Sequence, residues 1–315
     1  MPRKIVIDTD PGVDDAMAII YALSCPELEV VALTTVFGNH NVDVCTSNAL
    51  QILEVAGRSD IPVARGAARP LAMDYLGAVE FIHGEDGQGN VHLPAPSTLA
   101  VSTPAARYIV DLVMANPGEI TLVPIGPLTN IALAMMMEPR LAANLVAIVI
   151  MGGNGFVCGN VSPAAEANIH NDPEAADIVF GADCPIVMLG LDVTERTNMT
   201  SAHLARYGAS ANPPAQYLAK VIPFYSDFHF ATSGMDGIHV HDSSTITYLV
   251  RPDLYTTVSH PIRVDCGHGI GRGNTIASER VPAANSPWAG RRDVTICVTV
   301  NAEAAIDLEL NRVCD

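Results

Sequence analysis

The stretch from residue 8 to residue 16 reads Asp8-Thr9-Asp10-Pro11-Gly12-Val13-Asp14-Asp15-Ala16. It follows a short run rich in β-branched residues, Lys4–Asp8, and it opens an amphipathic helix pattern. In an open α/β sheet, ligands bind at the carboxyl ends of the strands, which is where such a loop lies. The stretch therefore indicates both the fold class and the place of a binding or catalytic site.

Strand and helix patterns alternate along the rest of the chain. Several of the strand candidates are apolar at consecutive positions, as strands buried on both faces should be. The further strand candidates are Val30–Val36, Ile61–Ala64, Ile120–Ile125, Leu145–Met151, Pro185–Leu189 and Val294–Val300. Stripes with helical period lie between them, at Asn41–Ala56 and Ala105–Met114. Helix starts are indicated at Thr103-Pro104 and Asp172-Pro173, where a capping oxygen precedes a proline suited to the first helical position.

This alternation predicts one α/β domain over residues 1–315. Its core would be a single large open sheet, mostly parallel and doubly wound, with helices on both faces. Residues from about 200 to 241 contain helical patterns and aromatic side chains but no clear strand. We therefore expect a helical excursion over the sheet in that region.

Composition excludes several classes of protein. Acidic residues number 34 and basic residues 17, so the formal charge is −17, which repels nucleic-acid phosphates. The most apolar region, Ile120–Met137, is interrupted by prolines and a glycine and cannot form a membrane-spanning helix. The chain reaches Asp8 and Asp10 before any long apolar run, which argues against a signal peptide and for a cytoplasmic protein. The seven cysteines form no C-x-x-C pair and indicate no zinc or redox site.

The acidic stretch itself has two readings. Asp10, Asp14 and Asp15 would repel one another unless a cation neutralised them, and clusters of carboxylate oxygens suit a hard ion such as Ca²⁺ or Mg²⁺. Alternatively, Asp14 and Asp15 lie in the first turn of a helix, where the helix dipole favours an acid without any ligand. The addition of Asp10 favours a functional site, and a further acid from elsewhere in the chain would be needed to complete a cation shell.

The same stretch resembles the Asp-rich signature of the nucleoside hydrolases that act on inosine and uridine, and further motifs occur in that family's order. The similarity extends from about Lys4 to Pro252. The further motifs are Thr34-Thr35-Val36-Phe37-Gly38-Asn39, Ile82-His83-Gly84-Glu85, Leu122-Val123-Pro124-Ile125-Gly126-Pro127-Leu128-Thr129-Asn130, Met151-Gly152-Gly153, Gly159-Asn160, Pro163-Ala164-Ala165-Glu166-Ala167-Asn168 and His241-Asp242.

The resemblance implies a Ca²⁺-dependent hydrolase that cleaves the N-glycosidic bond of purine or pyrimidine ribonucleosides, in nucleoside salvage and catabolism, as a homodimer or homotetramer. The ligands of Ca²⁺ would be Asp10, both oxygens of Asp15, Asp242 and the main-chain carbonyl of Ile125. Asp10 would also be the general base, acting on a water molecule that the cation has made more acidic. Neutral amides and carboxylates would pair with the ribose hydroxyls. By resemblance these are Asp14, Asn39, Asn160, Glu166 and Asn168.

The leaving base needs a proton donor or a site that stabilises its anion. By resemblance His241 is the leaving-group acid and His83 a second candidate. Tyr225, Phe228 and His229 share one helical face and could stack on a base or hydrogen-bond to it, although core packing explains the same stripe.

The chain departs from the family pattern in three places. Ala167 replaces an aromatic residue, Ser243-Ser244 replaces a proline-containing continuation, and Gly89-Asn90 stands where Gly-Gly is usual. These changes leave the predicted metal and ribose chemistry intact but put the base preference in doubt.

Two other functions are compatible with part of the pattern. Asp8-Thr9-Asp10 matches the Asp-x-Asp spacing of Mg²⁺ phosphohydrolases, although basic residues that would bind phosphate are scarce around the motifs. A nucleoside-binding protein without activity would keep the pocket, yet the presence of both Asp10 and His241 argues against it.

Overall fold

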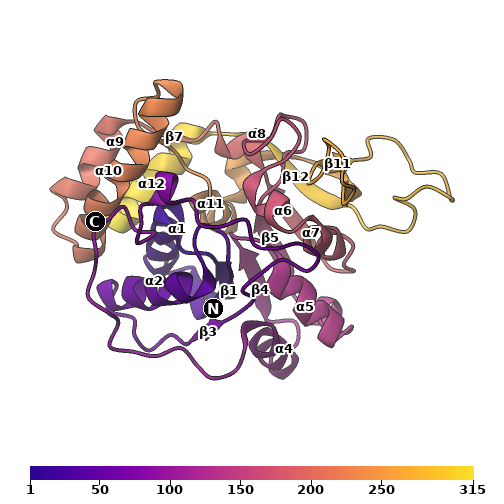
Figure 1. Ribbon diagram of the computed structural model, residues 1–315, viewed down its shortest axis with the longest axis horizontal. Coiled ribbons are helices and arrows are strands. Elements are labelled where there is room, and N and C mark those ends of the chain that lie inside the picture. The colour runs from indigo at the N-terminus through magenta and orange to yellow at the C-terminus, as the bar shows by residue number, and fades with distance from the viewer.

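The structure, a computed structural model that describes residues 1–315, is built on one eight-stranded sheet (Figure 1). All neighbouring strands are parallel except the last pair, in which β9 runs antiparallel to β12. In sheet order the strands are β3 (Val63–Arg65), β2 (Leu28–Thr35), β1 (Arg3–Thr9), β4 (Ile120–Pro124), β5 (Ala147–Met151), β6 (Ile186–Leu189), β12 (Val294–Val300) and β9 (Tyr255–His260). The predicted α/β class with a mostly parallel sheet is therefore confirmed.

Helices cover both faces of this sheet, and each face has its own hydrophobic core. One face carries α1 (Val13–Leu23), α2 (Val42–Val55), α8 (Leu191–Thr194), α9 (Ser201–Ala209), α10 (Pro213–Ser233), α11 (Ser243–Val250) and α12 (Ala302–Cys314). The other face carries α4 (Ala105–Ala115), α5 (Thr129–Met137), α6 (Ala167–Asn171) and α7 (Pro173–Phe180). Short helical turns occur at α3 (Glu80–His83), η1 (Ala142–Asn144) and η2 (Pro252–Leu254).

Strand β1 shows why the central strands consist of apolar, β-branched residues. Successive side chains of a strand point to opposite faces, so a strand between two helical layers must be apolar on both. Ile5 and Ile7 belong to the core beneath α1, whereas Val6 belongs to the core beneath α4 and α5. All three side chains are buried.

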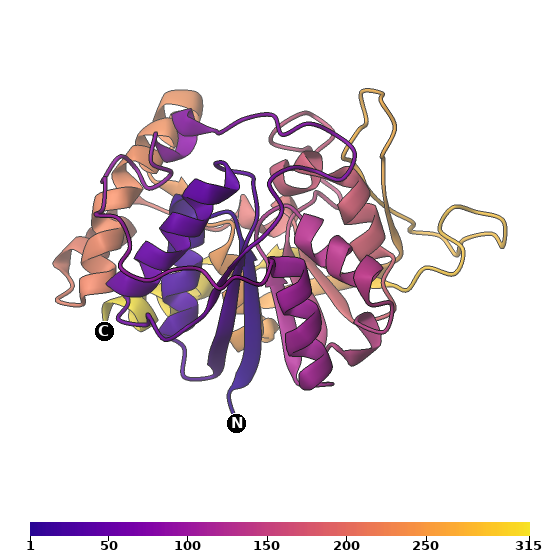
Figure 2. The same cartoon turned by 60° about the horizontal axis from the view of Figure 1, so that its bottom comes forward.

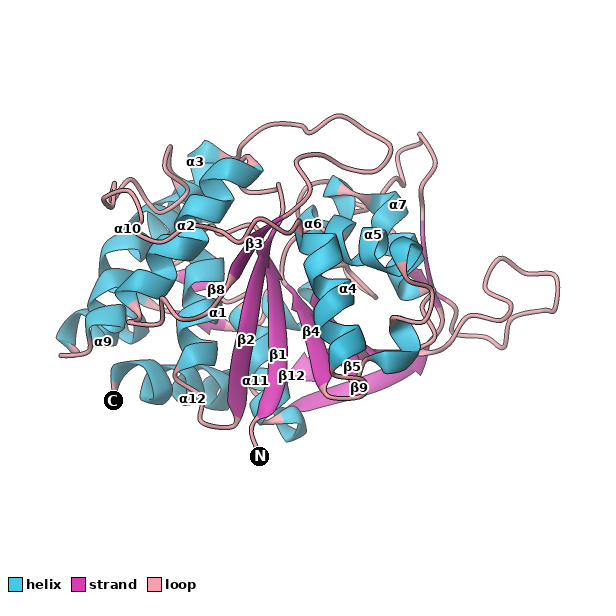
Figure 3. Cartoon of the chain, turned by 90° about the horizontal axis from the view of Figure 1, so that it is seen from below, coloured by secondary structure: helices cyan, strands magenta, loops and turns pink.

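The strand order places the functional loops together. The order reverses at β1 and β4, because the chain after β1 crosses one face through α1 whereas the chain after β4 crosses the other through α5. In doubly wound sheets this reversal is where ligands bind. In Figure 3 the N-terminus lies at the bottom and β1 and β2 point upward. Helix α3 and long loops lie at the top, beyond the carboxyl ends of these strands. The Asp10 loop and the Ile125-Gly126 loop therefore begin side by side.

Several elements were absent from the prediction. All seven predicted strands exist, but the antiparallel edge strand β9 was missed, because its sequence Tyr-Thr-Thr-Val-Ser-His is polar and largely exposed. The hairpin of β10 (Ile262–Val264) and β11 (Thr275–Ala277) was also missed. The chain after β11, from about residue 278 to 293, projects away from the body of the molecule (Figure 2).

The predicted helical region is confirmed in the main, and one of the two predicted helix starts is wrong. The region 200–241 is mainly helical, as predicted, but short strands frame it: β7 (Asn198–Met199) pairs with β8 (Ile238–His239). Thr103 does not cap α4, because Pro104 occupies the N-cap position in an extended conformation and no side chain caps the helix. Asp172 does cap α7, since its side chain accepts a hydrogen bond from the Ala175 amide and Pro173 is the first helical residue.

No helix combines the length and apolar character that crossing a membrane requires.

The core under α5 and α7 supports a stability prediction. Ile148 on β5 is fully buried, so Ile148→Ala should destabilise the fold by about 2–5 kcal/mol through lost burial and the cavity left behind. Val146, two residues earlier, is 41% exposed, so Val146→Ala should cost much less. Urea denaturation midpoints of the two variants measure the difference. Equal midpoints would contradict the assignment of Ile148 to the core.

Candidate active site

Asp10 follows the last residue of β1 and is buried between the ends of the two neighbouring strands. Its Oδ2 accepts a hydrogen bond of 2.7 Å from the Asn39 amide, whereas its Oδ1 is buried with no partner. Gly38 after β2 and Gly126 after β4 approach this carboxylate closely. A Cβ built at Gly38 would lie 2.7 Å from Asp10 Cγ, and one at Gly126 would lie 2.9 Å from it. Only glycine fits at either position while Asp10 stays in place.

Asp15 is held by four donors. Its Oδ1 accepts from the Thr9 hydroxyl at 2.5 Å and from the Asp10 amide at 3.2 Å. Its Oδ2 accepts from the Gly12 amide at 2.9 Å and from Asn39 Nδ2 at 3.0 Å. Asp15 is the third helical residue of α1. The prediction that this acid lies in the first turn of a helix is therefore correct. These bonds also fix the direction of the carboxylate.

Three carboxylates from two distant parts of the chain meet at this place. Asp14, Asp15 and Asp242 each offer an oxygen that lies within 4.8 Å of the other two. Asp242 immediately precedes α11, so the acid required from elsewhere in the chain is present. Asp10 lies beside this trio but is not one of its members, whereas Asp14, predicted for the ribose, is.

The trio and Asp10 carry no compensating positive charge from the protein. None of the ion pairs in the structure involves them. Burial, followed by repulsion from Asp15, raises the pKa of Asp14 to about 7. Burial likewise raises the pKa of Asp10 and of Asp242 well above the usual value, with repulsion from the neighbouring carboxylates adding to it.

These observations fit a hard cation. Asp10 Oδ1 and Asp14 Oδ1 are buried oxygens without a donor, and buried polar atoms normally have a partner. The available ligand atoms are all oxygens, which Ca²⁺ and Mg²⁺ prefer to nitrogen or sulfur.

Asn168 on α6 contacts the carboxyl ends of two adjacent strands, at Ile125 after β4 and at Met151 of β5. Asn168 Nδ2 donates to the Ile125 carbonyl at 2.9 Å and to the Met151 carbonyl at 3.2 Å. The carbonyl predicted as a metal ligand therefore already accepts one hydrogen bond and retains a second lone pair. Asn168 thus holds together the two strand ends at the site.

Glu166 has a local role as well as a place near the site. It is buried and caps α6, with Oε1 accepting from the Asn168 amide at 2.9 Å and Oε2 accepting from the Gly153 amide at 2.8 Å. The reading of this residue as part of a polar turn before a helix is therefore correct locally. Asn160 lies on an exposed loop, and its Oδ1 accepts from the Ala167 amide at 3.1 Å.

His83 and Tyr225 come together from α3 and α10. Their rings stack with centroids 5.5 Å apart and an interplanar angle of 19°. His83 Nδ1 accepts a hydrogen bond of 3.2 Å from the Val13 amide, so the ring proton of neutral His83 must reside on Nε2. Burial, with His229 nearby, lowers the pKa of His83 to about 3 and keeps the ring neutral. Tyr225 also belongs to the core, so core packing accounts for its place in the helical stripe.

A second group of rings extends from α10 to the residues around Asp242. His229 contacts Tyr225 and His239 edge-on, with centroids 4.6 and 5.1 Å away, and His239 lies 5.6 Å from His241. His241 Nδ1 is 2.9 Å from the Thr194 hydroxyl. Burial and the three other histidines lower the pKa of His241 to about 3. The Nε2 atom of His229 is buried without a partner.

Sequence reasoning missed His239. His239 lies two residues before the predicted site residue His241, in the sequence His239-Val240-His241. In an extended segment, this spacing places the two histidine side chains on the same side. This signal was available in the sequence.

The structure also explains one departure from the family pattern. Asn90, in place of the usual glycine, has a φ of +60°, a left-handed conformation that asparagine tolerates better than most residues. Its Oδ1 accepts a hydrogen bond of 2.7 Å from the Glu85 amide. The backbone at position 90 thus has a conformation that glycine also adopts readily.

The side chain of Asp8 does not join the acidic group around Asp10. Its Oδ1 accepts from the Thr34 hydroxyl at 2.5 Å and from Asn130 Nδ2 at 2.8 Å, on the face of the sheet that carries α5. Burial raises the pKa of Asp8 to about 7. This internal network disfavours the phosphohydrolase reading, which would require Asp8 and Asp10 to act on one substrate.

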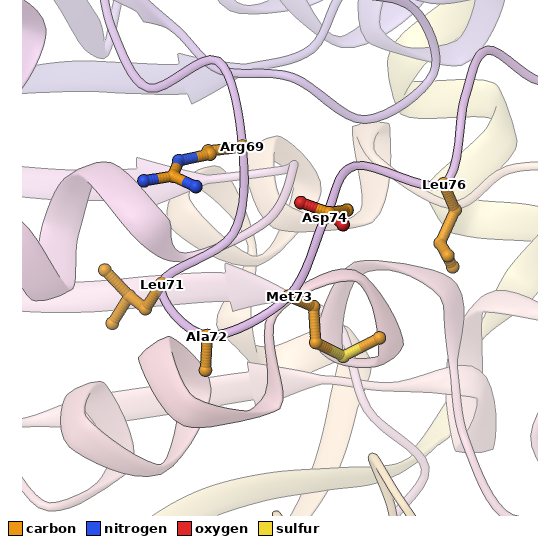
Figure 4. A pocket seen from close by; sticks show the side chains of 6 residues that line it. All are labelled: Arg69, Leu71, Ala72, Met73, Asp74 and Leu76. Carbon is orange, nitrogen blue, oxygen red and sulfur yellow. The ribbon is translucent and has the colours of Figure 1, made fainter.

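The loop before α3 contains a separate cavity of about 490 Å³ (Figure 4). Its lining residues are Arg69, Leu71, Ala72, Met73, Asp74 and Leu76. None of the predicted site residues lines it. The loop is nevertheless anchored to the site region, because the Tyr75 hydroxyl donates to the Gly38 carbonyl at 3.1 Å.

The chain closely resembles known proteins over nearly its whole length. Residues 5–307 match the family model described as inosine-uridine preferring nucleoside hydrolase. It is 43% identical to the probable uridine nucleosidase 2 of Arabidopsis thaliana over 98% of this chain and 97% of that protein. It is 38% identical to the pyrimidine-specific ribonucleoside hydrolase RihA of Enterobacter sp. (strain 638), over 99% of this chain and 98% of that protein.

A solved structure agrees with these relatives. The plant nucleoside hydrolase PpNRh1 superposes with a TM-score of 0.97 at 40% sequence identity, over 100% of this chain and 99% of that one. The family suggested by the sequence motifs is thereby confirmed. The chain is a hydrolase of N-glycosyl compounds and belongs to the inosine-uridine preferring nucleoside hydrolase family.

Proposed function

We propose that this protein hydrolyses the N-glycosidic bond of ribonucleosides to free base and ribose, and that it requires bound Ca²⁺. The observation that carries the proposal is the meeting of Asp14, Asp15 and Asp242 within 4.8 Å, beside Asp10, without any basic partner. Because the chain belongs to the nucleoside hydrolase family, we take nucleosides as the substrates of this acidic site. Uridine is the first substrate to test, since two relatives are named for uridine and for pyrimidine ribonucleosides.

The proposed ligands of the cation are Asp10, Asp15, Asp242 and the Ile125 carbonyl. Asp14 lies close enough to contribute to the cation or to a ribose hydroxyl beside it. When bound, the cation would orient the attacking water molecule and the ribose hydroxyls and make that water more acidic. Asn39, Asn160, Glu166 and Asn168 are proposed to complete the ribose pocket.

Asp10 is the proposed general base. Its Oδ2 is tied to the Asn39 amide, whereas Oδ1 has no donor and can accept a proton from the attacking water. The water oxygen forms a bond to the anomeric carbon while the bond from that carbon to the base nitrogen breaks. The bonding electron pair leaves with the base. Nearby carboxylates stabilise the positive charge that develops on the ribosyl ring.

The base end of the site would stabilise the leaving group. His241 is the proposed leaving-group acid, and because its pKa is lowered to about 3 it would act as a neutral ring that donates an N–H to the departing base nitrogen. His83 presents an Nε2–H as a second donor, because its Nδ1 accepts from the Val13 amide. The ring of Tyr225, stacked on His83, offers a surface on which a planar base can lie, with His229 beside it.

We further propose a cytoplasmic homodimer or homotetramer, which sedimentation measurements can test.

Base release from a nucleoside panel tests the class of reaction and the metal together. At least one of uridine, cytidine, inosine and adenosine should yield free base and ribose, and removal of Ca²⁺ by a chelator should abolish release until Ca²⁺ is restored, because the carboxylates would then lack their counter-charge. Chromatography of the products provides the measurement. Release that persists in full after verified removal of all metal would contradict the Ca²⁺ requirement.

The ribose pocket predicts discrimination against deoxynucleosides. A 2′-deoxynucleoside leaves polar groups of the site without a partner, so its kcat/KM should fall at least about 100-fold below that of the matching ribonucleoside. Steady-state kinetics on uridine and 2′-deoxyuridine test this. Equal values for the two substrates would rule out the proposed contacts to the ribose hydroxyls.

Replacement of Asp10 tests its role as base. Asp10→Asn keeps the shape of the side chain but removes its basicity, so kcat should fall by about two to four orders of magnitude while circular dichroism stays unchanged. Asp43→Asn is a suitable control, because Asp43 is exposed and pairs only with Arg65. Turnover of the Asp10 variant at the level of the control would remove Asp10 from the mechanism.

A further inference from the structure

The backbone that carries the acidic residues is held from behind by two buried amide side chains. The carbonyl of Pro11 accepts from Asn48 Nδ2 at 3.1 Å and from Gln88 Nε2 at 3.2 Å. The carbonyl of Gly12 accepts from Gln88 Nε2 at 2.9 Å and from the Ala16 amide at 3.2 Å. Pro11 therefore depends on side chains for its hydrogen bonds, whereas Gly12 also has its helical partner.

Asn48 is a polar residue in an otherwise apolar position. It lies on the buried side of α2 with Cys45, Ala49 and Ile52, and only 4% of it is exposed. Its Nδ2 donates a second hydrogen bond, of 3.0 Å, to the Asp86 carbonyl. Both amide hydrogens of Asn48 are thus used, one on the β1–α1 loop and one on the loop after α3.

The loop after α3 leaves room for the side-chain amide of Asn48. Gly87 has a φ of +72°, and a Cβ built there would lie 2.8 Å from Asn48 Nδ2. Gln88 cannot fully replace Asn48, because its single Nε2 group already serves the carbonyls of Pro11, Gly12 and Gly87. Its Oε1 in turn accepts from the Tyr217 hydroxyl of α10.

We propose that Asn48 is a positioning residue that fixes the Pro11–Gly12 backbone and thereby the directions of Asp10, Asp14 and Asp15. The inference rests on the proposed function, since it assigns these carboxylates to a cation. Asn48 itself touches neither substrate nor cation. It acts through Pro11 and Gly12, which connect Asp10 to the first turn of α1, where Asp14 and Asp15 lie.

The test compares Asn48→Leu with Gln51→Leu. Gln51 lies one turn further along α2 and donates to the carbonyls of Leu93 and Pro94, at 3.4 and 2.8 Å, away from the acidic loop. Calorimetric titration of the substrate-free proteins with Ca²⁺ should show affinity weakened about 10- to 100-fold in Asn48→Leu only, as expected for a partner one step removed from the ligands. With saturating Ca²⁺, kcat on uridine should fall while KM for uridine changes little.

Hydrogen exchange supplies a readout that needs neither metal nor turnover. In Ca²⁺-free protein, a peptide covering residues 9–17 should exchange faster in Asn48→Leu than in wild type, and at the wild-type rate in Gln51→Leu. If Asn48→Leu does not fold, Asn48→Ala removes the same donors without adding apolar volume, and the same result is expected.

The outcomes separate the two proposals. Faster exchange confined to residues 9–17 supports the positioning role even if wild type neither binds Ca²⁺ nor releases base, a result that would overturn the proposed function alone. Exchange and Ca²⁺ affinity that are the same in the Asn48 and Gln51 variants would overturn the positioning role, whatever the activity of the wild type.

Discussion

Mutual repulsion among buried carboxylates is the constraint around which this protein is organised. Asp10, Asp14, Asp15 and Asp242 are drawn together from two parts of the chain without any lysine or arginine to offset them. The fold keeps them in place with neutral donors: backbone amides, the Thr9 hydroxyl and the Asn39 side chain. Such donors orient an anion without neutralising its charge, which leaves the attraction for a cation intact.

The reversal of strand order supplies the location for this arrangement. Because α1 and α5 lie on opposite faces, the loops after β1 and β4 run to opposite sides of the sheet. Their first residues nevertheless lie side by side, since the two strands are neighbours. Most of the aromatic and histidine side chains come from the helical region between β6 and β12, which packs on the α1 face, whereas His83 comes from α3. The segment from Asp10 to Asp15 thus supplies three of the four acids, and the later region supplies Asp242 and most of the rings.

The sequence predicted most of the sheet and the position of the acidic loop because both depend on local patterns. Runs such as Lys4–Asp8 are recognisable from a few adjacent residues, and the motif around Asp10 is contiguous. The contact of Asn48 with Pro11, in contrast, joins residues 37 positions apart. The helical period places Asn48 on the apolar side of α2, but no local pattern shows which group it contacts there. The edge strand β9 escaped prediction for a related reason: its partner β12 lies far along the chain, and its exposed side chains are polar. The double role of Glu166, as a helix cap and as a neighbour of the acids, likewise appears only in three dimensions.

The close approach of Gly38 and Gly126 to Asp10 has a consequence for how this sequence can vary over evolutionary time. Alanine is the smallest possible replacement for glycine, yet a methyl group at either position would overlap the carboxylate. Neither glycine has a side chain that could take part in chemistry, and neither would attract notice in a search for reactive groups. Neither position can accept a side chain while Asp10 stays in place, so any selective pressure that keeps Asp10 extends to two neighbours whose contribution is to leave space for it.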